Sequence, residues 1–373
     1  MRAPVPPFTA EHERLRVEIR EFVHTRLRPH ADEWEQAQWF PNEVFGWLAQ
    51  AGYLGLKFPV EYGGAGDTVA AAVLVEELSR CGSGGLAAGL GAHAGIALPP
   101  ICTFGTEEQK QRYLVPGLRG ELVAALAITE PDAGSDVASI RTHARRVQDG
   151  YVVNGSKTFI TGGVRADVLV TAVRTKPEGG HQGISFLIIE RGEGVRSSPL
   201  KKLGWHASDT AEIGLEDVFV PEENLLGPEH GGFYLIMANF QWERLLMALG
   251  AVGAMQAVFE RTLTFARGSA GRQAVRHRLA EIALTIETGR AVTYAALRRH
   301  VAGEDAVREV TIAKLATQRA AFDVIDACLQ LHGLDGYFAD AELQRAARDA
   351  RLGPIGGGTD EIMKEILGRS LGL

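Results

Sequence analysis

The chain has 373 residues, of which 46% are hydrophobic and 23% are charged, and its formal net charge is −7. This composition is typical of a soluble globular protein of two or three subdomains, and it lacks the basic excess that nucleic-acid binding requires. The three cysteines lie far apart, and the chain has neither an apolar signal segment nor an apolar run of membrane-spanning length, so we expect a cytoplasmic protein without disulfides, structural zinc or membrane insertion.

The first third of the chain shows helical periodicity. Apolar residues recur at spacings of three and four from Leu15 through Ile19 to Leu27, and similar patterns occupy residues 44–54 and 69–80. We therefore predict an N-terminal α-helical domain over residues 1–122.

Residues 123–228 change to a β pattern. The segment YVVNGSKTFIT contains Asn154 and Gly155 between β-branched and aromatic residues, which predicts a β-hairpin that turns at this pair. Three further runs, ADVLVTAV, GISFLIIE and AEIGLEDVFV, are apolar or alternating and are separated by Gly, Pro and Asn, so we predict a central β-domain.

Helical periodicity returns in residues 229–373. Long segments at about residues 233–267, 273–302 and 305–332, and shorter ones near 339–351 and 359–371, are joined by short loops. Long helices with short connections are typical of a bundle, which we predict for this C-terminal domain.

The loop in ALAITEPDAGSDVASI is the first candidate ligand site. Gly134 and Ser135 form an exposed turn, and Thr129, Ser135 and Thr161 place hydroxyls beside the strands, an arrangement suited to a planar polar ligand. From spacing alone, a plain β-turn followed by a hairpin explains the same residues.

Six segments, in order and spacing, resemble the acyl-CoA dehydrogenase family. They are GTEEQKQRYLVPGLRGE, AITEPDAGSD, NGSKTFITGG, LGWHASDTAEIGLEDVFVPEENLLG, QLHGLDGY and RDARLGPIGGGTDEIMKEIL, and the match covers roughly residues 10–371. The resemblance implies a multi-domain α+β fold with an N-terminal α-helical domain, a central β-barrel domain and a C-terminal four-helix bundle. The order of helical and β segments predicted from periodicity agrees with it.

The resemblance also implies an FAD between the β-domain and the bundle, with Thr161 hydrogen-bonded near flavin N5. The residues that it implies around the cofactor are Ala127, Ile128, Thr129, Gly134, Ser135, Phe159, Ile160, Thr161, Arg267, Gln330, Gly333, Thr359 and Glu361. The segments of Arg267, Gln330 and Gly333 reach the FAD of a neighbouring subunit in the family, which implies a homo-oligomer, either a dimer or a tetramer. Thr359 is also suited to the N-cap of the last helix, and Gly333 to a left-handed helix cap.

The reaction implied is α,β-dehydrogenation of an acyl-CoA thioester to the trans-2-enoyl-CoA, with an electron-transfer flavoprotein as electron acceptor. Such a reaction needs a carboxylate that removes the α-proton. Most members carry a glutamate in the loop matched by IGGGTDEI, where this chain has Gly357. The long-chain and isovaleryl branches instead carry it on a bundle helix in a Glu-Arg-Leu sequence, which FQWERLL matches at Glu243.

The helical pattern around Glu243 supports this transfer. Glu243 lies on one predicted stripe with Ile236, Phe240 and Met247, and a carboxylate on an apolar stripe indicates a task. Burial there should raise its pKa toward the working pH. We predict that Glu243 is the catalytic base, and a structural ion pair within the bundle is the alternative.

Three residues are implied as contacts of the acyl-CoA substrate, namely Ser135, Arg244 and Gly358. Arg244 matches a family arginine that contacts the CoA portion, and an ordinary salt bridge in the bundle is its alternative. The acyl chain length is not readable from these residues.

Two segments depart from the family pattern. Between Arg267 and Gln273 the chain is shorter than in the family and Ala270 replaces a phenylalanine, while Leu334 replaces a glycine. These departures keep two other functions open: a flavin-dependent monooxygenase or oxidase on the same fold, and a degenerate homologue that binds acyl-CoA without turnover. The histidines show no metal-ligand spacing, and we assign no metal.

Overall fold

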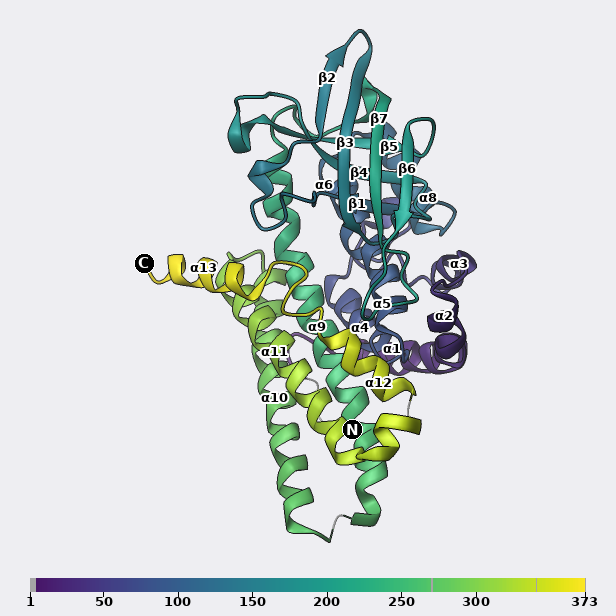
Figure 1. Ribbon diagram of the computed structural model, residues 1–373, viewed down its shortest axis with the longest axis vertical. Helices are drawn as coiled ribbons and strands as arrows, with labels where there is room; N and C mark the ends of the chain where they lie inside the picture. Colours follow the sequence, from purple (N-terminus) through teal and green to yellow (C-terminus); the bar gives the residue numbers. More distant parts are fainter. Residues whose placement is uncertain (1–4, 270, 340, 373) are drawn as a thin grey trace.

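The structure is a computed structural model that describes residues 5–269, 271–339 and 341–372. Over these ranges the chain forms a group of short helices, then strands, then long helices, joined by short 3₁₀ and π turns. The sheet lies at one end of the molecule, the long helices extend to the other end, and the N-terminal helices pack beside them (Figure 1). The predicted order of helical, β and helical parts is confirmed.

The N-terminal helices bury a shared apolar core. Their bounds are α1 Ala10–Phe22, α2 Ala31–Ala37, α3 Glu43–Gln50, α4 Thr68–Leu78, α5 Gly84–Gly91, α6 Leu98–Phe104, α7 Glu107–Gln109 and α8 Val115–Leu118. Local signals set their starts: the Asp67 side chain, for example, accepts hydrogen bonds from the backbone of Val69 and Ala70 and caps α4. The predicted helices at 44–54 and 69–80 correspond to α3 and α4.

The eight strands form an open sheet. Their bounds are β1 Ala124–Ala127, β2 His143–Val147, β3 Gly150–Ile160, β4 Val168–Arg174, β5 Ile184–Glu190, β6 Val195–Pro199, β7 Ala211–Pro221 and β8 Leu225–Leu226. The strand order is β6-β7-β3-β2-β4-β5-β8, and β1 pairs with β4 in parallel. The runs ADVLVTAV, GISFLIIE and AEIGLEDVFV become β4, β5 and β7 as predicted.

The expected β-barrel does not close, because the edge strands of the described sheet, β6 and β8, are not paired with each other. Strands β2 and β4, in the middle of the sheet, meet at the single pair of His143 and Arg174. The halves on either side of this pair pack through side chains, with β1 against β3 and β5 against β7. Their shared core includes Tyr151, Leu169 and Ile213. The other face of β4 and β5 packs on the N-terminal helices, which explains why both strands are apolar along nearly their whole length.

The predicted hairpin turn at Asn154 and Gly155 is also wrong. Both residues lie inside β3, and the chain turns instead at Asp149, whose φ is 63°. Gly155 marks a β-bulge against β7, with a φ of 148°, and a Cβ there would lie 2.6 Å from the Thr142 Cα. Gly155 therefore allows the close approach of the backbone at Thr142 and does not form a turn.

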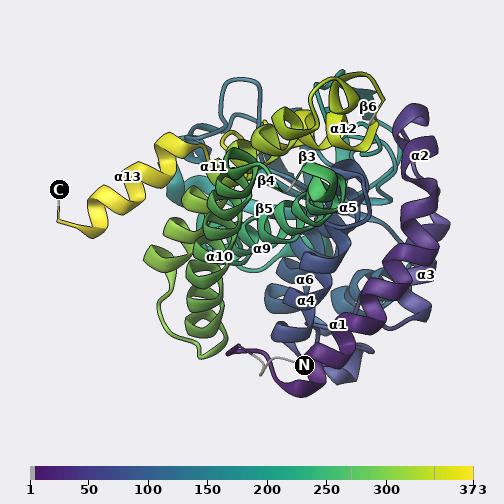
Figure 2. The same cartoon turned by 90° about the horizontal axis from the view of Figure 1, so that it is seen from below.

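Five helices follow in the described part of the chain: α9 Gly232–Ala266, α10 Gln273–Val301, α11 Val307–His332, α12 Ala341–Ala350 and α13 Asp360–Ser370. The first three pack side by side, and α12 and α13 pack on α11. Each begins and ends within a few residues of the segment predicted from periodicity. Helix α13 projects sideways from the body (Figures 1 and 2).

The stretch Gly84–Phe104 is long and apolar enough to cross a membrane, which the sequence pattern did not predict. Of its most apolar window, 61% is buried inside the structure. Its central turn packs against β1 and α9. Its apolar composition is therefore explained by a position in the core.

Asp349 on α12 joins all three parts of the chain. Its Oδ1 accepts a hydrogen bond from the Trp205 backbone N–H at 2.5 Å, and its Oδ2 accepts one from the Gly84 N–H at 3.0 Å. Trp205 follows β6 and Gly84 begins α5, so one carboxylate holds the β-domain and the N-terminal helices against α12. Burial raises the pKa of Asp349 to about 6.

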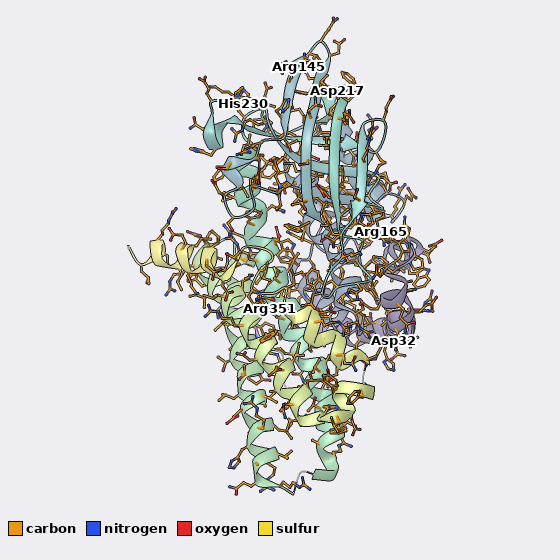
Figure 3. The ribbon with its side chains drawn as sticks, in the orientation of Figure 1. Asp32, Arg145, Arg165, Asp217, His230 and Arg351 are labelled. Atoms are coloured by element: carbon orange, nitrogen blue, oxygen red, sulfur yellow. The ribbon has the colours of Figure 1, made fainter. Side chains whose placement is uncertain are left out.

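Arg165 forms a second junction, between the sheet and the N-terminal helices (Figure 3). Its Nε donates to Asp209 Oδ1 at 2.7 Å, and its guanidinium carbon lies 3.9 Å from the ring centroids of Trp39 and Phe40. A buried ion pair flanked by aromatic rings fixes the sheet relative to these helices. The strand ends and the long helices consequently have one defined relative position.

Candidate active site

The two segments expected to surround the cofactor meet at the ends of β1 and β3. The Thr158 backbone N–H donates to the Thr129 carbonyl oxygen at 2.8 Å and ties one segment to the other. Ala127, Ile128 and Ile160 have buried side chains, so these residues form the wall of the site with their backbone. Thr129 and Thr161 are half-buried at its edge.

Phe159 has an unusual position in this wall. Its side chain is 70% exposed although it is aromatic, and its φ is 60°, a left-handed value that a residue with a Cβ rarely adopts. The strand bulges between Lys157 and Ile160 at the same place. An exposed ring on strained backbone is typical of a surface shaped for a ligand.

A buried ion pair supports the neighbouring loop. Lys157 Nζ donates to the Ile128 carbonyl oxygen at 3.0 Å and to Glu130 Oε1 at 2.7 Å. The Glu130 carboxylate also accepts the backbone N–H groups of Arg141 and Thr142, at 2.6 and 2.9 Å. Burial lowers the pKa of Lys157 to about 8. The loop that begins at Glu130 is therefore anchored at both of its ends.

Gly134 and Ser135 lie exposed in this anchored loop. A Cβ on Gly134 would lie 3.7 Å from the Thr129 methyl group, so the loop passes beside the β1 end. The structure thus brings together the residues expected around the flavin ring from Ala127 to Ser135 and from Phe159 to Thr161.

Glu243 lies on α9, on the stripe predicted from spacing. Ile236 is buried, and Phe240 and Met247 are partly buried. The Oε2 atom of Glu243 is itself buried and has no hydrogen-bond partner among the described residues. Burial raises the pKa of Glu243 to about 7, although the positive charges of Arg244 and Lys314 act to lower it. A carboxylate without a partner and with a pKa near neutrality is suited to accept a proton.

Arg244 is buried beside this carboxylate. Its guanidinium carbon lies 5.4 Å from the Phe240 ring centroid, and its Nε has no hydrogen-bond partner within the described ranges. Burial lowers its pKa. The alternative considered from sequence was an ordinary salt bridge within the bundle. Such a salt bridge does not satisfy this Nε among the described residues, so the Nε is available as a donor to a ligand.

The glycine loop covers the same turn of α9. Gly357 and Gly358 have φ values of 59° and 91°. A Cβ on Gly357 would lie 2.1 Å from Met247 Sδ, and one on Gly358 would lie 3.8 Å from Arg244 Nε. The loop that lacks the usual glutamate therefore lies directly over the helix that carries Glu243.

The start of the last helix follows this loop. Thr359 Oγ1 accepts the Ile362 N–H at 3.2 Å, which confirms the predicted N-cap. Asp360 Oδ2 accepts a bond from Arg319 Nε at 2.6 Å, whereas Glu361 is exposed. Thr359 and Glu361 thus lie next to the glycine loop, at the edge of the site.

Three expected cofactor residues are not part of this group. Arg267 follows the end of α9, and Gln330 and Gly333 lie at the end of α11. These helix ends lie at the end of the molecule that is farther from the sheet (Figure 1). Gly333 has the positive φ that was predicted, 59°, but its ψ of −133° lies outside the left-handed helical region. Ala270 lies outside the described residues.

Sequence reasoning missed three groups that support the site. They are the Lys157–Glu130 ion pair, Lys314 and Gln318. A signal existed for Lys314, which shares a helical stripe with the buried residues Val310 and Thr317. No local pattern pairs Lys157 with Glu130, because the two meet only through strand pairing.

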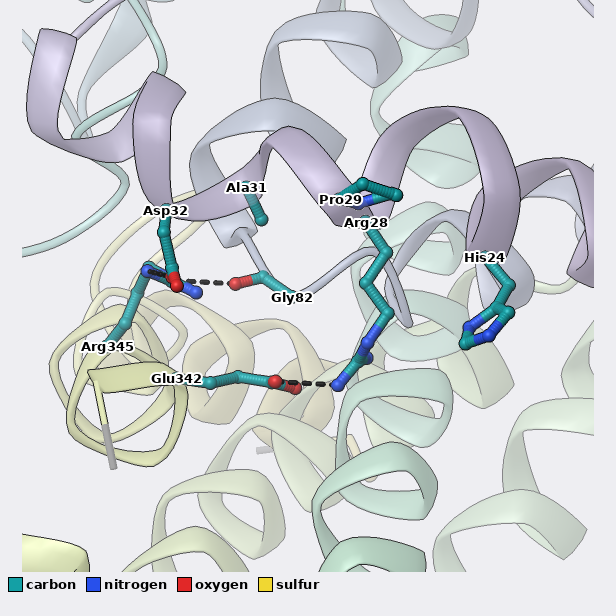
Figure 4. A pocket seen from close by; sticks show the side chains of 8 residues that line it. All are labelled: His24, Arg28, Pro29, Ala31, Asp32, Gly82, Glu342 and Arg345. Atoms are coloured by element: carbon teal, nitrogen blue, oxygen red, sulfur yellow. Dashed lines mark hydrogen bonds and ion pairs between the residues drawn. The ribbon is translucent and has the colours of Figure 1, made fainter. Parts of the chain in front are cut away.

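A cavity of about 370 Å³ lies elsewhere, between the N-terminal helices and α12 (Figure 4). Two ion pairs cross it: Arg28 Nη2 to Glu342 Oε2 at 2.6 Å, and Arg345 Nη1 to Asp32 Oδ1 at 2.9 Å. Its charged side chains therefore neutralise one another and act as an interdomain contact.

Three family profiles match the chain in order. The profile described as "Acyl-CoA dehydrogenase, N-terminal domain" matches residues 9–121. The middle-domain and C-terminal-domain profiles of the same family match residues 125–218 and 230–372.

Individual proteins match over nearly the whole chain. The mitochondrial long-chain specific acyl-CoA dehydrogenase of Mus musculus is 36% identical over 98% of this chain and 87% of its own length. The mitochondrial isovaleryl-CoA dehydrogenase of Solanum tuberosum is 36% identical over 98% of this chain and 91% of its own length. The crystal structure of an acyl-CoA dehydrogenase from Geobacillus kaustophilus has a TM-score of 0.94 and 38% identity, covering 99% of this chain and all of that one.

Proposed function

This chain belongs to the acyl-CoA dehydrogenase family, and from that premise we propose that Glu243 is the base of its reaction. Members of the family are flavin-dependent oxidoreductases that bind FAD and dehydrogenate acyl-CoA thioesters, and this chain is an enzyme of that class. The observation that carries the proposal is the buried Glu243 carboxylate, without a hydrogen-bond partner among the described residues, beneath a loop that has no glutamate.

The strand ends fit an FAD. The exposed, strained Phe159 and the hydroxyls of Thr129 and Thr161 offer an aromatic face and hydrogen-bonding groups beside a loop fixed by Glu130. Thr161, Ser135 and Gly134 are the residues that we propose around the flavin ring. Bound FAD supplies the acceptor for the hydride that leaves the β-carbon.

The chain's own residues provide the proton chemistry. The α-proton of a thioester is only weakly acidic, so its removal needs an aligned base whose pKa is near the working pH. Glu243, with a pKa of about 7, is about half ionised at neutral pH and its Oε2 is free to accept the proton. We propose the product to be the trans-2-enoyl-CoA.

Three residues are proposed as substrate contacts: Arg244, Ser135 and Gly358. The unsatisfied Nε of Arg244 supports a role toward the CoA portion, since guanidinium groups suit phosphate and amide oxygens. Gly358 lies against this arginine. Met247 occupies the space that a side chain at Gly357 would fill, since a Cβ there would lie 2.1 Å from its Sδ.

The proposed partners follow from the family. We propose an electron-transfer flavoprotein as the electron acceptor, and a homo-oligomer, a dimer or tetramer, of cytoplasmic location. The position of Arg267, Gln330 and Gly333 at the ends of α9 and α11, away from the strand ends, supports the oligomer, because in the family these segments reach the FAD of a neighbouring subunit.

The test is Glu243→Gln in the FAD-loaded enzyme. Mixed anaerobically with a panel of straight and branched acyl-CoAs, the variant should bind the substrate but lose the bleaching of the flavin by about a thousandfold or more, because amide nitrogen and oxygen cannot take the proton. Glu260→Gln, on the same helix but paired with Arg80, is the matched control and should bleach at the normal rate. Full-rate bleaching by Glu243→Gln would sink the assignment.

The same experiment separates the oxidase alternative. Substrate-dependent oxygen consumption that persists in Glu243→Gln would indicate a flavin oxidase or monooxygenase on this fold. Oxygen consumption that is negligible, with electrons passed to an artificial acceptor, supports the dehydrogenase.

A further inference from the structure

We propose that Lys314 is a positioning residue of the reaction: its ammonium group holds the glycine loop over the turn of α9 that carries Glu243 and favours the ionised form of that carboxylate. The inference rests on the proposed function, because it concerns how Glu243 acts as the base. Lys314 itself touches neither Glu243 nor the position of a substrate by any hydrogen bond described here.

Lys314 binds the backbone of the glycine loop from α11. Its side chain is fully buried in α11. Its Nζ donates to the Gly353 carbonyl oxygen at 2.9 Å and to the Gly358 carbonyl oxygen at 2.5 Å. These two carbonyls bracket the glycine segment, so one side chain fixes both of its ends.

Gln318, one helical turn further along α11, fixes the neighbouring turn of α9 with a second hydrogen bond. Its Nε2 donates to the Met247 carbonyl oxygen at 2.6 Å, one turn after Glu243. A Cβ on Gly353 would lie 2.1 Å from Gln318 Oε1, so the loop also rests on this amide. Lys314 and Gln318 therefore join α11, the loop and the base-carrying turn of α9 into one unit.

The charge of Lys314 acts on Glu243 as well. Among the described residues, the charged groups that influence the pKa of Glu243 are Arg244 on its own helix and Lys314 on α11. Burial lowers the pKa of Lys314 to about 8, Asp360 and Glu243 raise it, and Arg244 lowers it. At neutral pH the ammonium is thus charged and favours the ionised carboxylate against the effect of burial.

The position of Lys314 near Glu243 bears on the ionisation of the base, which the reaction requires. A base buried without a partner drifts toward the protonated form, which cannot accept the α-proton. A nearby cation that is itself satisfied by carbonyl oxygens offsets that drift without bonding directly to the base. A substantial fraction of the carboxylate is therefore ionised near neutral pH, and its Oε2 remains available.

The test is the rate of anaerobic flavin reduction by acyl-CoA as a function of pH, in the FAD-loaded enzyme. In Lys314→Met the midpoint of the acid limb should rise by about one pH unit, because the cation that favours the ionised base is gone. Lys364→Met, which removes an exposed lysine from α13, is the matched control and should leave the midpoint unchanged. An unchanged midpoint in Lys314→Met overturns the inference.

Gln318→Leu separates position from charge. It should slow flavin reduction by about tenfold, because the turn that carries the base is no longer held, while the acid midpoint stays in place. If Lys314→Met does not yield a folded enzyme, Lys314→Gln, which keeps a donor for the loop carbonyls but removes the charge, decides: a raised acid midpoint supports the role of Lys314, and an unchanged midpoint overturns it.

Failure of this inference is distinguishable from failure of the proposed function. If Glu243→Gln reduces the flavin at full rate, the base assignment fails and Lys314 has no base to position. If Glu243→Gln is inactive and Lys314→Met keeps the normal midpoint, only the role of Lys314 fails.

Discussion

At the scale of the residue, the site depends on side chains that are poorly satisfied. Glu243 and Arg244 each have a buried polar atom without a hydrogen-bond partner in the described part of the chain, and Phe159 exposes an aromatic ring on strained backbone. The place of Glu243 on an apolar helical stripe was predictable from spacing, whereas its proposed role as the base came from the family resemblance. Strain at Phe159 was not predictable, since it arises from a bulge that only the strand pairing reveals.

Burial of Glu243 should also cost stability in a pH-dependent way. Its pKa is raised from 4.5 to about 7 in the folded chain, so the fold favours the protonated form. Below the unfolded-state pKa of 4.5 the side chain is protonated and its contribution to the free energy of unfolding is fully present. This contribution is lost as the pH rises through the folded-state pKa of about 7. Glu243→Gln should therefore raise the free energy of unfolding at pH 8 by about 1 to 2 kcal/mol and have little effect at pH 4. Chemical denaturation at both pH values checks this, and an equal effect at both would contradict it.

At the scale of the element, periodicity predicted the helices well and the sheet incompletely. The segments that became α9, α10 and α11 were predicted nearly to their ends, because each buries a continuous stripe. Asn154 and Gly155 were taken for a turn, but strand pairing decided otherwise. The barrel prediction failed for a related reason: closure depends on long-range pairing, and the edge strands β6 and β8 do not pair with each other.

The glycine loop offers a prediction at this scale. Gly357→Ala should destabilise the fold by about 1 to 2 kcal/mol, because φ is 59° and the new Cβ would meet Met247 Sδ. Gly356→Ala is the matched control, since a Cβ there would have its nearest neighbour at 3.6 Å and φ is not positive. Thermal unfolding of both variants measures the difference. Equal melting temperatures for the two would show that the loop is not constrained at Gly357.

At the scale of the whole molecule, three parts of the chain are locked by a few buried polar contacts. Asp349 receives the backbone N–H groups of Trp205 and Gly84, which belong to different parts. The order of the parts was predictable from sequence, whereas these junctions were not, because they join residues far apart in the chain. The same limit applies to Arg267, Gln330 and Gly333, whose distance from the strand ends no sequence pattern states.

Asp349→Ala tests the junction. The N–H groups of two half-buried residues lose a charged acceptor, so the free energy of unfolding should fall by about 1 to 3 kcal/mol and the parts should unfold less cooperatively. Asp326→Ala, an exposed position on α11, is the control and should change stability by less than about 0.5 kcal/mol. Denaturant unfolding followed by tryptophan fluorescence and far-ultraviolet circular dichroism measures both the loss of stability and the loss of cooperativity. Coincident, unshifted transitions in Asp349→Ala would argue against the junction.

The contact between Gly357 and Met247 bears on how such an enzyme can change during evolution. The loop and the helix approach the same place from different elements, so a carboxylate on either one would reach it. A lineage passing through a chain with both acids would never lack a base, and the redundant one could then be lost by a single substitution. Relocation of the catalytic group to the loop would also require Met247 to move, because a Cβ at Gly357 would lie 2.1 Å from its Sδ, and would place a side chain on left-handed backbone.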